Sequence, residues 1–411
     1  MKSLWKWCTV AVAVALFVVW GSQAQDWNIQ SVAQGPDTAK QRVIEHDVAV
    51  DADGVVYVSY IDQAANAIKL LQMKGDEKAT TGLVRDTGRV IGTTVAVSNE
   101  LVCVAWEELS DESGVHEVWQ ACWGKPLEND AAPKVEPQRW STEGVIAGQA
   151  NGAGWEEFGF NFDNTFAPDG TLYAVWTEDY SKLVAAKYVG GNVQACGEFP
   201  PLPISDAPNR YPNIHVDSAG GVWVAVADVS YPPGPDIWIW YSSDQCASWK
   251  GPVNSTPTGL YSDGPGIVRL GDKIYQVNDD DAGAAPGTAD IHVNVCDATP
   301  DGAANCVRNV VHQDGGFPNI ATDGKGLYVA SQDGSANEVK FSYSCDAGGT
   351  WTPAHIPNKW NSGYRDPDFG AVLSRVRVAT SAGSPNVYVA WFWRSEGKSN
   401  IMLGILPKPC P

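Results

Sequence analysis

Short apolar segments follow turn-forming residues at intervals along most of the chain. The first, VVYVSY, comes after Asp53 and Gly54, and six more follow comparable turns: LVCVAW, TLYAVW, VWVAV, KIYQV, LYVAS and VYVAWFW. Their successive spacings range from 46 to 70 residues. Apolar alternation and a high content of β-branched and aromatic residues predict a β-strand for each of the seven.

Each of these strands has neighbours of the same kind. Alternating segments precede several of them, at 46–51, 212–217, 318–322 and 374–380, and AIKLLQM, EVWQACW, DIWIWYS and EVKFSYS follow others. A unit of three or four antiparallel strands repeated every ~40–60 residues is typical of a propeller blade. We therefore expect an all-β, seven-bladed β-propeller of four-stranded blades. Six blades is the first alternative and a pair of β-sandwiches the second. Segment 26–34 would supply the outer strand that closes the last blade.

The first 24 residues have the pattern of a secretory signal peptide. Lys2 and Lys6 precede an apolar run from Thr9 to Trp20, and small residues lead to a cleavage site after Ala24. The apolar run is too short to span a bilayer, for which roughly 20 residues are needed. We expect residues 1–24 to be removed, residues 25–411 to form a single propeller domain, and the protein to be secreted or periplasmic.

Composition narrows the choice of partners. The chain carries 28 Lys and Arg against 48 Asp and Glu, a formal net charge of −20. That charge argues against a nucleic-acid partner, and no other segment could form a stable membrane span. With 44% hydrophobic residues, the chain has enough apolar surface to fold. We expect a monomer.

Because the protein is expected to be exported, its cysteines are expected to form disulfides. Cys8 leaves with the signal peptide, and eight remain. Cys103 and Cys122 flank residues 111–114 symmetrically, so a hairpin turning there would place them opposite each other. Cys296 and Cys306 bracket a Pro-Asp-Gly turn in the same way. The other four allow three pairings: Cys196, Cys246, Cys345 and Cys410. No CxxC occurs and the histidines are not spaced as zinc ligands, so we expect no metal site.

Two turns carry a recognisable signature. Residues 344–351 have the form S-x-D-x-G-x-T-W, and residues 242–249 repeat it with Cys246 at the glycine position and Ser248 for threonine. These segments resemble the Asp-box (BNR repeat) of the sialidase-like propeller superfamily. The resemblance implies that each box forms the turn between the third and fourth strands of a blade. Its expected structural residues are Ser242, Asp244, Trp249, Ser344, Asp346, Gly348 and Trp351.

Propeller topology then predicts where a functional site would lie. Turns between strands one and two share a face with the Asp-boxes. The opposite face combines the loops after each second strand with the connections that enter each first strand. In sialidase-like propellers this second face holds the substrate. Six of the seven second strands end in acids here, and the seventh has Arg394: Asp62, Glu107, Glu108, Glu178, Asp179, Asp228, Asp279 to Asp281 and Asp333.

These acids allow two interpretations. In a chain this acidic, they can simply be polar residues at strand ends. Alternatively they form a carboxylate-rimmed mouth that holds a cation or supplies acid and base groups, because neighbouring carboxylates raise one another's pKa. Such a mouth suits a hydroxyl-rich sugar and repels an anionic one. We expect no cofactor, and bound calcium is left open.

The resemblance also suggests individual residues. Sialidase-like enzymes use three arginines to bind a substrate carboxylate, a tyrosine nucleophile with a glutamate, and an aspartate acid/base. Arg42, Arg210 and Arg365 precede first strands, although the Arg-Ile-Pro tripeptide typical of the first blade is absent. The candidate catalytic residues are Asp62, Glu156, Glu157 and Tyr364. The candidate substrate-binding residues are Arg42, Arg210, Tyr211, Arg365 and Trp155.

Several functions fit these residues. The first is a secreted propeller that recognises glycan or polysaccharide at an acidic, aromatic-containing face. The second is a sialidase-like glycoside hydrolase. A third is a propeller-type polysaccharide lyase, in which a neutral histidine or a tyrosine removes a proton. A protein-binding scaffold is the alternative from another class. The lyase candidates are His46, His215, His292 and His312 with Tyr364 or Tyr211.

Overall fold

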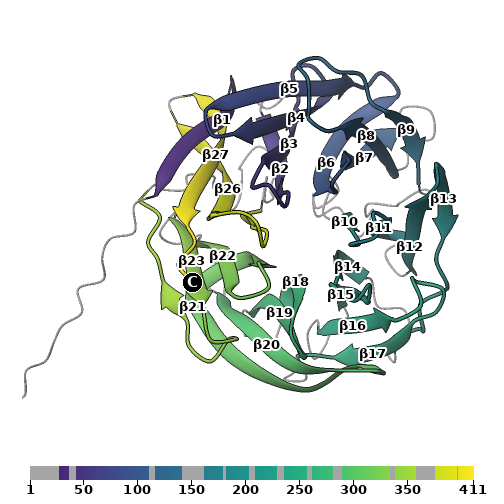
Figure 1. Cartoon of the computed structure of the whole chain (residues 1–411), viewed down its shortest axis with the longest axis vertical. Coiled ribbons are helices and arrows are strands. Elements are labelled where there is room, and N and C mark those ends of the chain that lie inside the picture. Colours follow the sequence, from purple (N-terminus) through teal and green to yellow (C-terminus); the bar gives the residue numbers. More distant parts are fainter. Residues whose placement is uncertain are drawn as a thin grey trace, which may run out of the picture.

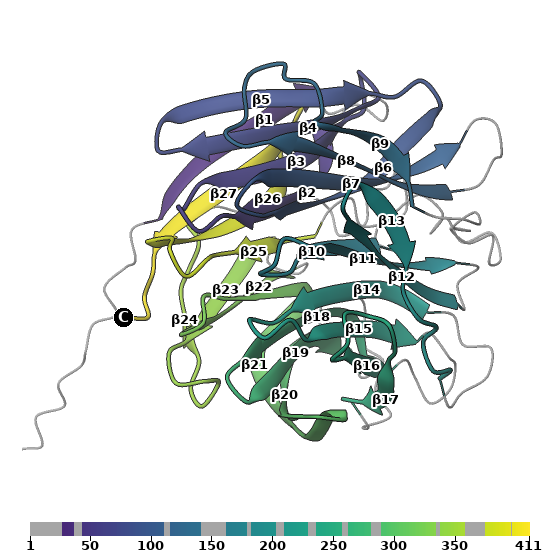
Figure 2. The same ribbon diagram turned by 45° about the vertical axis from the view of Figure 1, so that its right-hand side comes forward.

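Antiparallel sheets form a ring around a central axis. The computed structural model describes residues 27–36, 43–110, 116–140, 162–178, 182–202, 209–228, 236–256, 262–280, 289–333, 338–357, 375–395 and 397–411. The first and last strands of this range lie side by side, which closes the ring (Figure 1). Figure 2 shows the sheets stacked face to face around the ring. In the part of the chain described, no helix is long and apolar enough to cross a membrane.

Four sheets each contain four consecutive strands, in the order of the chain. The first strand of each lies nearest the axis (Figure 1). The first sheet contains β2 (Val43–Val50), β3 (Val56–Asp62), β4 (Ala67–Lys74) and β5 (Glu77–Val84). The second contains β6 (Gly88–Val97), β7 (Leu101–Ser110), β8 (His116–Gly124) and β9 (Val135–Arg139). The third contains β10 (Phe162–Phe166), β11 (Leu172–Glu178), β12 (Lys182–Val189) and β13 (Asn192–Ala195). The fourth contains β14 (Asn209–Val216), β15 (Val222–Asp228), β16 (Ile237–Ser242) and β17 (Lys250–Asn254).

A fifth sheet has seven strands because one long strand serves two groups. Strand β21 pairs with β20 through residues 302–315 and with β22 through residues 316–322. Each half of the sheet therefore has the four-strand arrangement of the others. Its strands are β18 (Ser262–Leu270), β19 (Lys273–Asp280), β20 (Ala289–Thr299), β21 (Gly302–Thr322), β22 (Leu327–Asp333), β23 (Glu338–Ser344) and β24 (Thr352–Pro353).

The N-terminal strand completes the last sheet, as the sequence predicts. Strand β1 (Asn28–Pro36) pairs antiparallel with β27 (Lys398–Pro407), beside β26 (Asn386–Ser395) and β25 (Arg377–Ala379). Just before β1, the indole of Trp27 packs edge-on against Phe341 of the neighbouring sheet, with ring centroids 5.2 Å apart. The chain ends are therefore joined by both hydrogen bonds and apolar contact.

Second strands form the core because sheets cover them on both sides. Every residue of β11, β15 and β22 is buried. This explains why the second strands are the most conspicuous apolar repeats in the sequence. Six tryptophans are almost fully buried between the sheets, namely Trp106, Trp123, Trp176, Trp223, Trp240 and Trp391.

The turns after β16 and β23 have the same hydrogen bonds. In the first, Asp244 accepts from the amide and hydroxyl of Ser248 at 2.9 and 2.6 Å, and Ser242 Oγ accepts from the amide of Cys246 at 2.9 Å. Cys246 has a φ of 63°, so this cysteine adopts the left-handed conformation of the glycine it replaces. Trp249 stacks on Phe199 of the preceding segment at 4.2 Å. The second turn repeats these bonds with Ser344, Asp346, Gly348 and Thr350 and is followed by Trp351.

Disulfides reinforce the ring at four places. Both predicted pairs form, and Cys103 and Cys122 are directly opposite residues of β7 and β8. The other four cysteines adopt one of the three pairings left open by the sequence. Each of those two bonds ties one of the similar turns to a distant segment. The four disulfides are Cys103–Cys122, Cys196–Cys246, Cys296–Cys306 and Cys345–Cys410.

Three aspartates link neighbouring sheets at the turns between first and second strands. Asp217 accepts from the amides of Ala219 and Gly221, both at 2.9 Å, and from the indole of Trp223 at 3.0 Å. Arg269 of the next sheet donates to the same carboxylate at 2.6 Å. A turn, a buried aromatic and a cation are thus held by one acid. Equivalent groups are Asp51 with Tyr57 and Lys125, and Asp323 with Tyr328 and Lys408.

Candidate functional site at the axis

The strand register defines two faces of the ring. Arg210 at the start of β14 pairs with Ala227 near the end of β15, whereas Ser242 pairs with Val222 at the start of β15. Starts of first strands therefore share a face with ends of second strands, and we call it the connection face. The Ser242 turn lies on the opposite face, which we call the turn face. The predicted separation of these two groups is confirmed for this sheet.

Bulges interrupt the first strands near the connection face. Pairing shifts register between Ile44 and His46 in β2, and the same interruption occurs in β14, β18 and β21. Within them, one residue has a left-handed backbone: Glu45, Tyr211, Gly264 and Phe317, with φ of 40°, 57°, 59° and 46°. Such conformations are costly for residues other than glycine and are retained where function or packing requires them.

Three side chains from different sheets meet at this level and fill the centre of the ring. The Arg375 guanidinium lies 4.3 Å from the ring centroid of Tyr211 and 5.4 Å from that of Phe317. The two rings pack edge-on at 6.2 Å. All three side chains are buried, with 5–8% exposed. Their contact joins separate sheets across the axis, and we call Tyr211, Phe317 and Arg375 the axial plug.

Glu45 is buried in the same ring of bulges. Only 4% of the residue is exposed, and its Oε1 accepts no hydrogen bond from any described residue. Burial raises the pKa of Glu45 well above its usual value, although Arg377 and Arg375 oppose the rise. Glu45 is therefore harder to ionise than an exposed glutamate, and it lies close enough to Arg375 of the plug to feel its charge.

A ring of polar side chains lies two residues further along the first strands. Four of these side chains each accept a hydrogen bond from a backbone amide of the next sheet, at 2.8–3.0 Å. They are Asp47, Asp163, Asn213 and Asn319. The same position in β25 holds Arg377, whose Nε lies 3.5 Å from Asp47 Oδ1. We call these five residues the polar ring. Its hydrogen bonds fix the register of one sheet against the next.

Two carboxylates of the polar ring are unfavourably placed for ionisation. Burial and the neighbouring charge of Asp47 raise the pKa of Asp163 to about 7, against the opposing effect of Arg377. Burial also raises the pKa of Asp47. A group whose pKa is higher in the folded state destabilises the fold as pH rises from its unfolded pKa towards its folded one.

Asp163→Asn should therefore change the pH dependence of stability. Relative to the wild type, the variant should gain about 2–3 kcal/mol in unfolding free energy between pH 5 and pH 8, because in this range only the wild type releases a proton on unfolding. Chemical denaturation at both pH values measures the difference. Asp301→Asn, at a side chain that is 90% exposed, is the control. A pH-independent difference for Asp163→Asn would contradict the assignment.

Most acids at the ends of second strands are already bonded inside the sheets. Three accept a hydrogen bond from an indole N–H, and two others pair with a cation on a later strand of the same sheet. They therefore support the interpretation of polar strand ends more than that of an open rim. The observed pairs are Glu108 with Arg85 and Trp106, Glu178 with Trp176, Asp228 with Trp238, Asp280 with Arg308, and Asp333 with Lys340. Asp179, Asp281 and the side chain of Arg394 lie outside the described residues.

The four candidate histidines lie in separate places. Burial lowers the pKa of all four, so they are neutral at physiological pH. His312 contacts the hydroxyls of Ser331 and Ser342 at 2.7 and 2.9 Å. His292 accepts from Arg308 at 2.7 Å. Among them, His46 is adjacent in sequence to the bulge residue Glu45, and His215 lines the axis on the side of the turn face.

The predicted catalytic and binding residues are only partly described. Asp62 is half-buried and accepts the amides of Ala64 and Ala65 in a hairpin turn, at 3.1 and 3.3 Å. Tyr211 lies in the axial plug, and Arg210 is described only through its backbone. Sequence analysis missed Glu45, Phe317 and Arg375. The remaining candidates lie outside the described residues: Arg42, Trp155, Glu156, Glu157, Tyr364 and Arg365.

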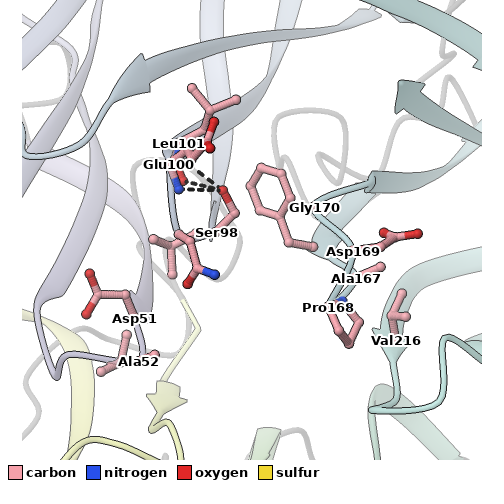
Figure 3. A pocket seen from close by; sticks show the side chains of 14 residues that line it. Asp51, Ala52, Ser98, Glu100, Leu101, Ala167, Pro168, Asp169, Gly170 and Val216 are labelled. Carbon is pink, nitrogen blue, oxygen red and sulfur yellow. Dashed lines mark hydrogen bonds between the residues drawn. The ribbon is translucent and has the colours of Figure 1, made fainter. Parts of the chain in front are cut away.

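A cavity opens at the other end of the axis, on the turn face. Its volume is about 580 Å³, and it lies between the turns at Asp51, Ser98 and Pro168 (Figure 3). It shares Val50, Val97 and Phe166 with a second cavity of about 300 Å³, which is lined by residues of the first strands. Among the described residues, no group of three or more His, Cys, Asp or Glu side chains could hold a metal ion.

Comparison with known proteins identifies the fold. No protein-family model matches the sequence, and no curated protein matches it. A PL25 ulvan lyase superposes with a TM-score of 0.57 at 12% identity, covering 92% of this chain and 95% of that one. The polysaccharide lyase Uly1 gives 0.55 at 9%, covering 92% and 99%. An α-L-arabinanase of Penicillium chrysogenum, complexed with arabinobiose, gives 0.50 at 11%, covering 92% and 98%. The fold is a β-propeller.

Proposed function

We propose that this protein is a secreted propeller of seven blades that recognises carbohydrate on its connection face. The seven blades are the five four-stranded sheets and the two halves of the seven-stranded sheet. The turns at 242–249 and 344–351 are its Asp-boxes. Residues 1–24 are its signal peptide, and the four disulfides support an oxidising, extracellular location.

The axial plug is the observation that carries this proposal. It brings a guanidinium and an aromatic hydroxyl-bearing side chain together at the centre of the connection face. Aromatic rings stack on sugars, and a guanidinium binds hydroxyls or a carboxylate through several N–H groups. The strained backbone at Glu45, Tyr211 and Phe317 is what an organised site is expected to show. Around this floor we place the predicted ligands Arg42, Trp155, Arg210, Tyr364 and Arg365.

The similar structures support the same ligand class. Those named above are described as lyases of polysaccharide, including ulvan, and as an arabinanase bound to arabinobiose. Since identity is 9–12%, the likeness itself extends to fold alone. The site must therefore be argued from the residues of this chain.

An enzyme acting on the same face is the second candidate. The pairing of Arg375 with Tyr211 favours a polysaccharide lyase, in which an arginine neutralises a uronate carboxylate and a tyrosine moves a proton. A glycoside hydrolase would instead use a pair from Asp62, Glu156, Glu157 and Tyr364. Glu45 adds a buried acid with a raised pKa to either scheme.

A binding screen and an activity screen run together test this proposal. The mature protein is applied to a glycan array and incubated with chromogenic glycosides and with uronate-containing polysaccharides, whose cleavage by a lyase creates an ultraviolet-absorbing double bond. We expect saturable binding to a restricted set of glycans. Turnover of any of these substrates would favour the enzyme over a protein that only binds glycan. Binding of no glycan, together with no turnover, would overturn the proposal and favour a protein-binding scaffold.

A further inference from the structure

The four disulfides differ in their access to solvent. In three of them one cysteine is at most 1% exposed and its partner is buried or partly buried. These are Cys103–Cys122, Cys196–Cys246 and Cys296–Cys306. In the fourth, Cys345 is exposed, and it is bonded to Cys410. A thiol breaks a disulfide by attacking one of its sulfur atoms, so access to that atom governs the rate. The Cys345–Cys410 bond is therefore the one that a thiol should reach first.

This exposed bond joins two neighbouring sheets. Cys345 directly follows β23, in the turn that carries Ser344 and Asp346. Cys410 belongs to residues 408–411, which follow β27 of the last sheet and which we call the clasp segment. The two cysteines are 65 residues apart in the sequence, so their bond closes a long loop. Strand pairing holds each sheet together internally, whereas this bond acts between sheets.

The clasp segment holds two turns of the turn face together. Lys408 Nζ lies 2.8 Å from the carboxylate of Asp323, which also accepts the hydroxyl of Tyr328 at 3.2 Å. The same ammonium group donates to the carbonyl of Ser381 at 2.6 Å, and the Lys408 amide donates to that of Pro385 at 2.9 Å. Lys408 thus connects the turn at 323–326 of one sheet with the turn at 381–385 of the next.

Cys410 fits closely against the first of these turns. Only 6% of it is exposed, and a β-carbon at Gly326 would lie 2.8 Å from its sulfur, so glycine allows the close approach. Lys325 donates to the carbonyl of Pro411, the residue after Cys410, at 3.3 Å. Lys325 and Lys408 therefore place positive charge near this end of the bond. Such charge favours a thiolate, which makes Cys410 the better leaving group when Cys345 is attacked.

We propose that the Cys345–Cys410 bond is a thiol-sensitive clasp, whose reduction loosens the joint between the last sheet and its neighbour at the turn face. The reductant is a low-molecular-weight thiol. Its thiolate attacks Cys345 Sγ, and Cys410 leaves as a thiolate that takes up a proton. A second thiol attacks the mixed disulfide and releases Cys345. Two external thiols thus become one external disulfide, and the protein gains two thiols.

Reduction of this bond leaves the rest of the ring tied. The other three disulfides remain, as does the pairing of β1 with β27. The clasp segment is then held by the contacts of Lys408 and Lys325 alone. Local opening of the turns at 323–326 and 381–385 is therefore expected without global unfolding. The inference is independent of carbohydrate recognition, because the clasp lies on the turn face.

Graded reduction of the mature protein with glutathione tests the order of reduction. Free thiols are alkylated at intervals, and the labelled cysteines are identified by mass spectrometry. We expect Cys345 and Cys410 to be labelled at least about tenfold faster than any other cysteine. Protein reduced at this bond alone should melt cooperatively at a temperature roughly 5 °C lower. Earlier labelling of another pair, or no labelling before the protein unfolds, would overturn the proposal.

Hydrogen–deuterium exchange tests the structural consequence on the same wild-type samples, so no variant has to fold. Reduction should speed exchange in the turns at 323–326 and 381–385 and leave the turn at 217–221 unchanged. The double variant Cys345→Ser/Cys410→Ser should show the faster exchange without any thiol. The matched control is Cys296→Ser/Cys306→Ser, which removes a bond within one sheet and should keep the thiol response. Unchanged exchange at both turns after reduction would contradict a clasp.

Discussion

Arg375→Met is expected to lower the affinity for the best glycan ligand by at least about tenfold, or 1.4 kcal/mol, while the protein remains folded. Methionine keeps most of the buried volume but removes the charge that lies over Tyr211 and Phe317. A cation–π contact in a desolvated place is worth about 2 kcal/mol. Without it the two rings lose their fixed arrangement, and the floor of the proposed site loosens.

The matched control for this variant is Arg269→Met. Arg269 lies on the first strand β18 and pairs with Asp217 at the turn face, away from the plug. Arg269→Met should lose stability and keep glycan affinity. Both variants are compared by titration with the glycan and by thermal melting. Equal glycan affinity for wild type and Arg375→Met would place the binding site away from the plug.

Removal of strand β1 is expected to have the largest effect on stability. A chain that begins at residue 37 loses every hydrogen bond between β1 and β27, and it loses the packing of Trp27 on Phe341. Loss of Trp27, Ile29, Val32 and Ala33 from the core should cost about 5 kcal/mol, since each large apolar side chain contributes up to ~1.5–3 kcal/mol. The melting temperature should fall by roughly 10 °C.

The control is a chain that begins at residue 25 and retains β1. This chain is the mature protein expected after cleavage at Ala24, and it keeps the pairing of β1 with β27. Calorimetry of the two chains gives the comparison. If the chain that begins at residue 37 melts at the same temperature, then β1 does not close the ring in solution.

The repeat and its closure were predictable because they follow from local rules. Second strands are covered on both sides, so they appear as apolar runs such as residues 222–226 and recur with the blade. The symmetric spacing of Cys103 and Cys122 about a turn gave the correct disulfide and register. The continuous strand β21 was not foreseen, since the segment His312–Gly316 contains residues typical of a turn. Asp314 does have a left-handed φ of 53°, yet strand pairing continues on both sides of it.

The axial plug was missed for a different reason. Alternation assigns each strand residue to a face, but a bulge adds one residue and changes the direction of the side chain. Tyr211 was predicted as a substrate-binding residue, but Phe317 and Glu45 were not noted. A usable signal existed: each lies two residues before the polar position that repeats as Asp47, Asn213 and Asn319. Large side chains two residues before this polar position are therefore expected to lie near the axis.

The most direct test of carbohydrate recognition at the connection face is hydrogen–deuterium exchange with the tightest-binding glycan. The account predicts slower exchange at the starts of first strands, including residues 209–213 and 315–319, and at ends of second strands such as residues 60–62. It predicts no change in the turns at 217–221 and 323–326. Slower exchange confined to those turns would contradict it and place the sugar on the opposite face.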